Sequence, residues 1–174
     1  MALRTILTKD NYEESLRKRS RPVTAFNERL HKMIDDMVET LLDSGGVGLA
    51  APQVGILRRI VVIQQEDGEI LELVNPEVIK TEGEETDLEG CLSIPGVWGE
   101  VTRPLTVTVK ALDRNGNPFE KTATGLIGRC FVHECEHLDG ILFVDRANRL
   151  LTEEELAQME AEAREETEEE ETAQ

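Results

Sequence analysis

The sequence contains no run of about 18 apolar residues, which is roughly the length that a membrane-spanning helix needs. Its first residues also show no charged stretch followed by an apolar segment and a small-residue cleavage site, so no secretory signal is predicted. Cysteine is scarce as well. An odd number of three argues against a disulfide framework and favours a reducing compartment. We therefore expect a cytoplasmic protein with no membrane partner.

Positive charge is also in short supply, because 36 acidic residues outnumber 19 basic ones and give a net charge of -17. The excess is uneven: the segment 152–174 holds eleven Glu and one Arg. Phosphates would be repelled by such a surface, which argues against nucleic acid or an anionic membrane as a direct ligand. The length suits one domain. We predict a single domain over 1–151 and an acidic tail, helical or disordered, over 152–174.

Histidine is rare too, and two of the three histidines lie in one segment, 129–140. His133 and His137 are four residues apart, which places both imidazoles on one face of a helix, where they can bind one metal ion. Glu134 is placed to reach a water molecule held by that metal without binding the metal itself. The apolar residues around this pattern indicate a buried helix, which favours a site over a chance match. The segment therefore predicts a metal-dependent hydrolase.

Such a site needs a third protein ligand, and the sequence offers several. The extended motif of one protease class has a third histidine where this chain has Phe143, which excludes that class. A downstream glutamate would have to come from the acidic tail, in which no single glutamate stands out. Cys130 lies near the same helix face as His133, and Cys91 lies in a segment rich in turn residues. Spacing alone leaves both cysteines as candidates for the third ligand.

Three short segments occur in a fixed order, about forty residues apart. Residues 46–55 read Gly-Val-Gly-Leu-Ala-Ala-Pro-Gln-Val-Gly, residues 89–93 read Glu-Gly-Cys-Leu-Ser, and residues 133–137 read His-Glu-Cys-Glu-His. Together they closely resemble the three signature motifs of the peptide deformylases, and the resemblance extends over about 6–149. It implies a metal-dependent amide hydrolase that removes the formyl group from the N-terminal formylmethionine of newly made proteins and releases formate.

The resemblance also assigns roles to individual residues. The implied metal ligands are Cys91, His133 and His137. A fourth position then stays open, as a catalytic metal site requires. Glu134 is implied as the residue that moves the proton. The side-chain amide of Gln53 and the backbone N–H of Leu92 are implied as donors to the oxyanion that forms.

A substrate pocket and a cofactor follow from the same resemblance. Val47, Leu126 and Cys130 match positions that line the pocket for the methionine side chain, and Gly48 offers backbone with which a bound peptide can pair as an added strand. The cofactor is one divalent metal ion per chain, Fe²⁺ first, with Ni²⁺, Co²⁺ or Zn²⁺ as alternatives. The partners are N-formylmethionyl nascent peptides. Any association with the ribosome would be transient, and the acidic tail is not expected to mediate it.

The chain departs from the family pattern at two positions beside the metal ligands. Val132 stands where a glutamine is usual, and Glu136 where an aspartate is usual. We expect Glu136 to pair with Arg103 and so to hold the motif helix to the strand after the cysteine loop. Two alternatives to a deformylase stay open: a zinc endopeptidase with another third ligand, and a non-catalytic relative that only binds formylated peptides.

The predicted fold class is α+β, with the motif helix packed centrally among antiparallel sheets, as the resemblance implies. An extended arm over 1–23 leads to an amphipathic helix of about twenty residues, capped by Thr24 and stopped by Gly45. Runs with β propensity, separated by turn signals, predict strands at 59–65, 69–74, 78–81, near 101, 105–111 and 119–123. The motif helix follows Gly125 and ends near 138. A helix capped by Thr152 is expected to fray from about Glu165.

Overall fold

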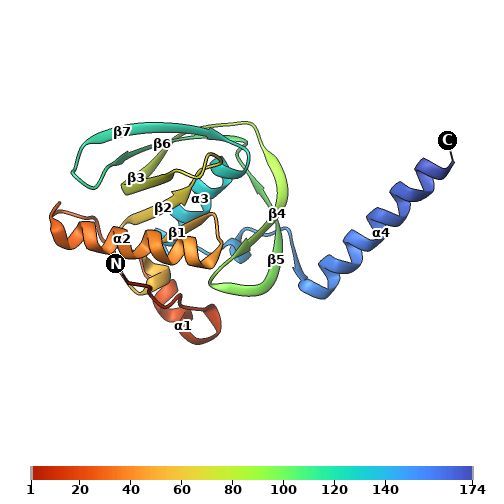
Figure 1. Ribbon diagram of the computed structural model, residues 1–174, viewed down its shortest axis with the longest axis horizontal. Helices are drawn as coiled ribbons and strands as arrows, with labels where there is room; N and C mark the ends of the chain where they lie inside the picture. Colours follow the sequence, from red (N-terminus) through yellow and green to blue (C-terminus); the bar gives the residue numbers. More distant parts are fainter. Residues whose placement is uncertain (1, 174) are drawn as a thin grey trace.

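The computed structural model describes residues 2–173 and has the predicted α+β architecture (Figure 1). Its helices are α1 (Lys9–Leu16), α2 (Glu28–Ser44), α3 (Leu126–Leu138) and α4 (Glu153–Thr172). Two short 3₁₀ turns are η1 (Ala51–Val54) and η2 (Phe143–Asp145). None of the helices within residues 2–173 combines the length and the apolar character needed to cross a membrane.

Two antiparallel sheets surround α3. The larger has the strand order β1-β2-β3-β6-β7, with bounds β1 (Gly48–Ala50), β2 (Ile60–Gln64), β3 (Ile70–Glu82), β6 (Thr106–Leu112) and β7 (Pro118–Thr124). The smaller has the order β4-β5-β8, with bounds β4 (Glu85–Cys91), β5 (Ile94–Arg103) and β8 (Arg149–Thr152). In Figure 1 the β4–β5 hairpin stands beside the larger sheet, next to the point where α4 leaves the body.

The apolar run at the centre of β2 is explained by burial on both faces of the larger sheet. Ile60 and Val62 pack in one cluster with α2, whereas Val61 and Ile63 pack in a second cluster with α3. Alternate residues of a strand face opposite sides of a sheet, so a strand covered on both sides has no polar face. The site-bearing helix α3 is thereby fixed against a sheet that α2 covers from the other side.

Helix α2 begins three residues later than the sequence predicted. The predicted cap, Thr24, is not the first residue before the helix. Instead the side chain of Asn27 accepts a hydrogen bond of 3.1 Å from the Leu30 N–H. Asparagine satisfies a helix N-terminus at least as well as threonine, so either residue was a competent cap by type alone. The predicted stop is confirmed, because Gly45 adopts the left-handed conformation with φ 71°.

The N-terminal segment was predicted as an extended arm, and this is wrong for part of its length. Residues 9–16 form α1, in which Leu16 is the one buried residue. A helix with a single buried side chain has no apolar repeat, which is why its sequence gave no helical signal. The extended part before α1 lies against the motif segments: Leu7 N–H donates to the Gln53 carbonyl (2.7 Å) and Lys9 N–H to the Ser93 carbonyl (2.8 Å).

The predicted β-hairpin is confirmed as β2 and β3, and the predicted strands at 105–111 and 119–123 are confirmed as β6 and β7. Two details differ. The segments 69–74 and 78–81 belong to one strand, β3, whose pairing with β6 shifts register between Val74 and Glu77, beside Asn75 with φ 50°. Strand β4 was not predicted, because Leu88 is the one apolar side chain between Glu85 and Gly90, which leaves no apolar alternation.

Helix α4 starts at the predicted cap, since Thr152 Oγ1 accepts a hydrogen bond of 3.2 Å from the Glu155 N–H. The fraying expected from Glu165 is not observed. The helix continues to Thr172, and Figure 1 shows it projecting away from the body. Glu and Ala have high helix propensity, and 153–172 contains no Gly or Pro to interrupt it. None of its residues is buried.

Candidate active site

Helix α3 carries two of the three predicted metal ligands and the predicted base. Gly125 precedes the helix, and His133, Glu134 and His137 are all buried. The two imidazole rings lie on one face, with centroids 5.0 Å apart, as the four-residue spacing requires. The helix therefore presents two imidazoles toward one point inside the protein rather than toward solvent.

Cys91 supplies the third donor from the smaller sheet. It ends β4, and its Sγ atom lies 3.3 Å from Nε2 of His137. Donor atoms of Cys91, His133 and His137 all lie within 4.8 Å of one another. Cys130, the alternative ligand, is not part of this group. Its Sγ instead packs against Gly48, where a Cβ would meet it at 2.6 Å. The structure thus brings together the three predicted ligands and separates Cys130 from them.

The ligand set and its surroundings suit a divalent cation. A thiolate with two imidazoles is a donor set that zinc, iron and nickel all accept. The Nδ1 atom of His133 is hydrogen-bonded to Glu89, which leaves its Nε2 free to bind a metal. Burial alone would lower the pKa of His133, but the adjacent Cys91 and Glu89 raise it well above its ordinary value. The surrounding anions therefore favour a positive charge at this point.

Glu89 is the functional residue that the sequence reasoning did not single out. Its carboxylate accepts hydrogen bonds from His133, from Arg103 (Nε 2.9 Å) and from Arg129 (Nη1 3.0 Å). All four side chains are buried. Arg129 also donates to the carbonyls of Val101 (2.9 Å) and Glu85 (2.9 Å), and so ties α3 to the β4–β5 hairpin. The only sequence signal was the position of Glu89 inside the Glu-Gly-Cys segment.

Glu134 lies in a site that makes its carboxylate basic. Burial raises the pKa of Glu134 to about 7, with the positive His133 opposing the rise and the charge of Glu89 adding to it. Its Oε2 atom has no hydrogen-bond partner within residues 2–173. A carboxyl group with a pKa near neutrality can both accept and return a proton. The environment thus suits general acid–base chemistry.

The orientation of Gln53, which lies in η1, is set by Ala50 at the end of β1. Its Oε1 accepts a hydrogen bond of 2.9 Å from the Ala50 N–H, so its NH₂ group faces the site. That group lies 3.5 Å from Cys91 Sγ and 3.1 Å from Ser93 Oγ. A side-chain amide held in this way presents donors to a bound carbonyl without needing to rearrange. Leu92, the other predicted donor, follows Cys91 and lines the same cavity.

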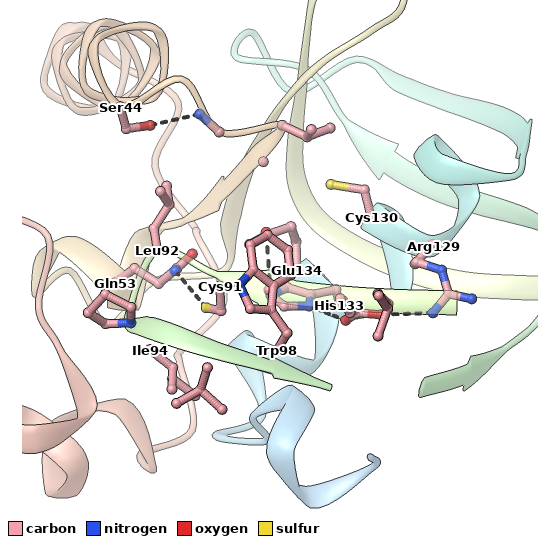
Figure 2. Close-up of a pocket in the computed structure, with 18 of the residues that line it drawn as sticks. Ser44, Gln53, Cys91, Leu92, Ile94, Trp98, Arg129, Cys130, His133 and Glu134 are labelled. Carbon is pink, nitrogen blue, oxygen red and sulfur yellow. Dashed lines mark hydrogen bonds and ion pairs between the residues drawn. The ribbon is translucent and has the colours of Figure 1, made fainter. Parts of the chain in front are cut away.

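A cavity of about 520 Å³ opens beside these residues. Its wall includes the predicted substrate residues Val47, Gly48, Leu126 and Cys130. Figure 2 shows Cys91, His133 and Glu134 together at its centre, with Leu92, Ile94 and Trp98 nearby and Cys130 apart from the Cys91 thiol. Gly48 is required by close packing, because a Cβ there would approach both Cys130 Sγ and Glu134 Cγ, at 2.6 and 3.0 Å. All the predicted site residues except His137 thus border one cavity.

The expected pair between Glu136 and Arg103 is present, and it extends further than predicted. Glu136 contacts Arg103 Nη1 and also accepts a hydrogen bond of 2.7 Å from Arg146 Nε. Arg103 in turn contacts Glu89, which contacts the predicted ligand His133. A chain of charged groups therefore connects the metal-binding centre with Arg146 at the surface.

Together with the antiparallel sheets around it, this centre defines the class of the protein, a metal-dependent hydrolase.

The chain belongs to the polypeptide deformylase family, since the model of that family matches residues 4–153. Members remove the N-formyl group from the N-terminal formylmethionine of nascent chains with a single catalytic metal ion. A peptide deformylase of Caldicellulosiruptor bescii is 54% identical over 158 residues, which cover 91% of this chain and 93% of the relative. Peptide deformylase 1 of Bacillus subtilis is 45% identical over 161 residues, covering 92% and 99%.

Solved structures of the family have the same fold. A crystal structure of a peptide deformylase from Legionella pneumophila has a TM-score of 0.79 at 43% identity and covers 99% of both chains. One from Synechococcus elongatus, in complex with actinonin, has a TM-score of 0.79 at 40% identity and covers 84% of this chain and 79% of that one. The predictions of family, fold class and enzymatic activity are thereby confirmed.

Proposed function

We propose that this chain hydrolyses the formyl amide of N-terminal formylmethionine at the centre formed by Cys91, His133, His137 and Glu134. The observation that carries the proposal is the convergence of three donor atoms within 4.8 Å of one another, beside a buried carboxylate. When bound, a divalent metal supplies a Lewis acid that makes water reactive near neutral pH. The remaining steps belong to the side chains of this protein.

Glu134 moves the proton. It accepts one proton from water as the water oxygen attacks the formyl carbon, and it delivers that proton to the methionine nitrogen as the C–N bond breaks. The products are formate and a free N-terminal amine. A pKa of about 7 suits both transfers, because neither direction is strongly uphill near neutral pH.

Gln53 and Leu92 stabilise the negative charge that develops on the formyl oxygen. The Gln53 NH₂ group faces the site because its oxygen is held by Ala50, and the Leu92 N–H is the second donor. Loss of one such donor typically costs about 3 kcal/mol of transition-state stabilisation. Val47, Leu126 and Cys130 line the part of the cavity that receives the methionine side chain, and Gly48 pairs with the peptide backbone.

The native metal is ferrous iron in this proposal, with nickel or cobalt as active substitutes and zinc as a weaker one. A thiolate–iron centre exposed to solvent through an open cavity is open to oxidation by air. Iron-loaded protein should lose activity in air, whereas nickel-loaded protein should keep it. Equal stability of both forms in air would contradict the assignment of iron.

We infer a cytoplasmic location, because nascent chains emerge there and free thiols such as those of the three cysteines persist there. Any contact with the ribosome is transient and does not involve α4, because eleven glutamates on 152–174 would be repelled by RNA phosphates.

Two matched variants test the ligand assignment. Formate release from formyl-Met-Ala-Ser should be lost in Cys91→Ser together with bound metal, whereas Cys130→Ser should retain one metal ion and most of the activity. Formate release is measured under anaerobic conditions, and metal per chain by atomic emission. Unchanged activity of Cys91→Ser would contradict the proposal. Cleavage of unformylated peptides would favour the endopeptidase, and bound metal without turnover would favour a non-catalytic relative.

A further inference from the structure

A buried serine links the two groups that are predicted to stabilise the oxyanion. Leu92 and Ser93 form the two-residue turn between β4 and β5. The Ser93 side chain is buried, and its hydroxyl accepts a hydrogen bond of 3.1 Å from Nε2 of Gln53. Ser93 is thus the chain neighbour of one predicted donor and the hydrogen-bond partner of the other.

The hydrogen bonds of the Gln53 amide leave one N–H for the site. A side-chain amide has one acceptor oxygen and two N–H donors. The oxygen accepts a hydrogen bond from the Ala50 N–H (2.9 Å), and one N–H is donated to Ser93. The amide nitrogen lies 3.5 Å from Cys91 Sγ, and Figure 2 shows it directed at that thiol. The second N–H is therefore available to a carbonyl group bound beside Cys91.

The N-terminal segment holds both of these loops from outside the cavity. The Leu7 N–H donates to the carbonyl of Gln53 (2.7 Å), and the Lys9 N–H donates to the carbonyl of Ser93 (2.8 Å). Thr8 between them is extended, with φ -105° and ψ 150°, so the N–H groups on either side of it face the same way. Residues 7–9 therefore span the two loops and fix the separation between them.

We propose that Ser93 is a positioning residue for the reaction. Its hydroxyl fixes the Gln53 amide, and its carbonyl, held by Lys9, fixes the turn that presents the Leu92 N–H. The inference rests on the proposed function of the cavity. Donors to an oxyanion are most effective when they are already in place before charge develops, because no reorganisation is then needed. Ser93 has this effect through Gln53 and Leu92, without contacting the substrate.

The first test removes the hydroxyl. Ser93→Ala should lower kcat by about 3- to 10-fold, the effect of one buried hydrogen bond, and leave KM and metal content unchanged. In a Gln53→Ala background the same change should cause no further loss, because the group that it positions is absent. The matched control is Ser20→Ala. Ser20 is also a buried serine, but its hydroxyl has no hydrogen-bond partner within residues 2–173, so kcat should stay at the wild-type value.

The second test removes the contact from the N-terminal segment. Lys9 is the first residue of α1, a position where proline keeps the helix and lacks only the N–H, and the extended Thr8 is compatible with a following proline. Lys9→Pro should therefore lower kcat by about 3- to 10-fold at unchanged KM and metal content. Lys9→Ala removes the same side chain but keeps the N–H, so it should retain the wild-type kcat.

The Gln53 amide can also be observed without turnover. In zinc-loaded protein, NMR signals of its NH₂ group are identified by their loss in Gln53→Ala. Their hydrogen exchange should be about 3- to 10-fold faster in Ser93→Ala than in wild type, and unchanged in Ser20→Ala.

Two results would overturn the inference: an equal loss of kcat from Ser93→Ala in the wild-type and Gln53→Ala backgrounds, or wild-type hydrogen exchange of the Gln53 amide in Ser93→Ala. The first would mean that Ser93 only supports the turn that carries Cys91. Absence of formate release by the wild type, with the amide still protected by Ser93, would contradict the proposed function while supporting the positioning of Gln53.

Discussion

At the scale of single residues, Glu89 is the group that connects the predicted metal ligand His133 with two buried arginines, Arg103 and Arg129. Burial alone would raise the pKa of its carboxyl group, but the donors His133 and Arg103 lower the pKa well below its ordinary value. Glu89 therefore stays ionised inside the protein. It holds the His133 ring by Nδ1 and lies two residues before Cys91, so it acts on predicted ligands from both α3 and β4.

Replacement of Glu89 by Gln should weaken metal binding by about 10- to 100-fold, because the ring of His133 loses its anionic partner. The same change should lower the free energy of unfolding by about 3–5 kcal/mol, since Arg103 and Arg129 are left buried and under-compensated. Chelator competition measures the first effect and urea unfolding of metal-free protein the second. Glu84→Gln, an exposed change in the turn before β4, is the control. Wild-type metal affinity in Glu89→Gln would contradict the role assigned to it.

Replacement of Gly48 by Ala tests the close packing around Glu134. The added Cβ would meet Cys130 Sγ at 2.6 Å and Glu134 Cγ at 3.0 Å, so one or both must move. We expect a loss of about 1–3 kcal/mol in the free energy of unfolding, and a lower kcat because the base is displaced. Adding Cys130→Ala removes the nearest contact and should restore part of the stability. Strictly additive effects of the two changes would exclude this contact as the cause.

At the scale of elements, the site depends on the attachment of α3 to the β4–β5 hairpin, because each carries part of the ligand set. The attachment consists of charged groups: Arg129 reaches from α3 to both strands, and Arg103 reaches from β5 to Glu89 and Glu136. Since α3 is fixed against the larger sheet by apolar contacts, these groups set the position of the smaller sheet relative to it.

Replacement of Glu136 by Gln should loosen this attachment. Arg103 would keep its ion pair with Glu89 but lose its ion pair with Glu136. Arg146 would also lose its ion-pair partner. We expect the free energy of unfolding to fall by about 1–3 kcal/mol and metal affinity to fall measurably. Arg146→Gln is the control. Because Arg146 is about half exposed, its replacement should lower the free energy of unfolding by less than about 1 kcal/mol. If chelator competition and urea unfolding both matched wild type, the pair would have no positioning role.

Elements whose apolar residues repeat regularly were predictable from the sequence, whereas elements held by polar contacts were not. Helix α2, the β2–β3 hairpin and α3 all follow from such patterns. Helix α1 buries one side chain and β4 has a polar sequence, so neither gave a signal. The site shows the same division. The motifs identified Cys91, His133 and Glu134, but the partners of Glu89 lie 14–44 residues away in the sequence and become neighbours only through folding.

At the scale of the whole molecule, carboxylates fasten the N-terminal segment to the body. Asp36 on α2 accepts hydrogen bonds from Ala2 N–H (2.8 Å) and Arg4 Nε (3.2 Å), and Asp145 accepts one from Arg17 (3.1 Å). Burial alone would raise the pKa of both carboxyl groups, but these donors lower each pKa below its ordinary value of 3.8. The segment between these contacts donates backbone hydrogen bonds to the carbonyls of Gln53 and Ser93, so its attachment to the body helps to position these residues of the site.

These two carboxylates predict how stability depends on pH. A carboxyl group whose pKa is lower in the folded protein stabilises the fold fully above its unfolded pKa, and that contribution is lost as pH falls through the folded value. Stability from Asp36 and Asp145 should therefore be complete above about pH 5 and decline below the ordinary pKa of 3.8. Urea unfolding between pH 7 and pH 3 measures this. The double variant Asp36→Asn/Asp145→Asn should show a shallower decline, and an unchanged slope would contradict the assignment.

The central claim is that Glu134 moves the proton during formyl hydrolysis at a metal held by Cys91, His133 and His137. The most direct measurement is formate release from formyl-Met-Ala-Ser by anaerobically purified, iron- or nickel-loaded enzyme, beside the variant Glu134→Ala. We predict formate release by the wild type and a loss of at least about 10²-fold in kcat in the variant, with one metal ion per chain in both. Comparable turnover by metal-loaded Glu134→Ala would contradict the account.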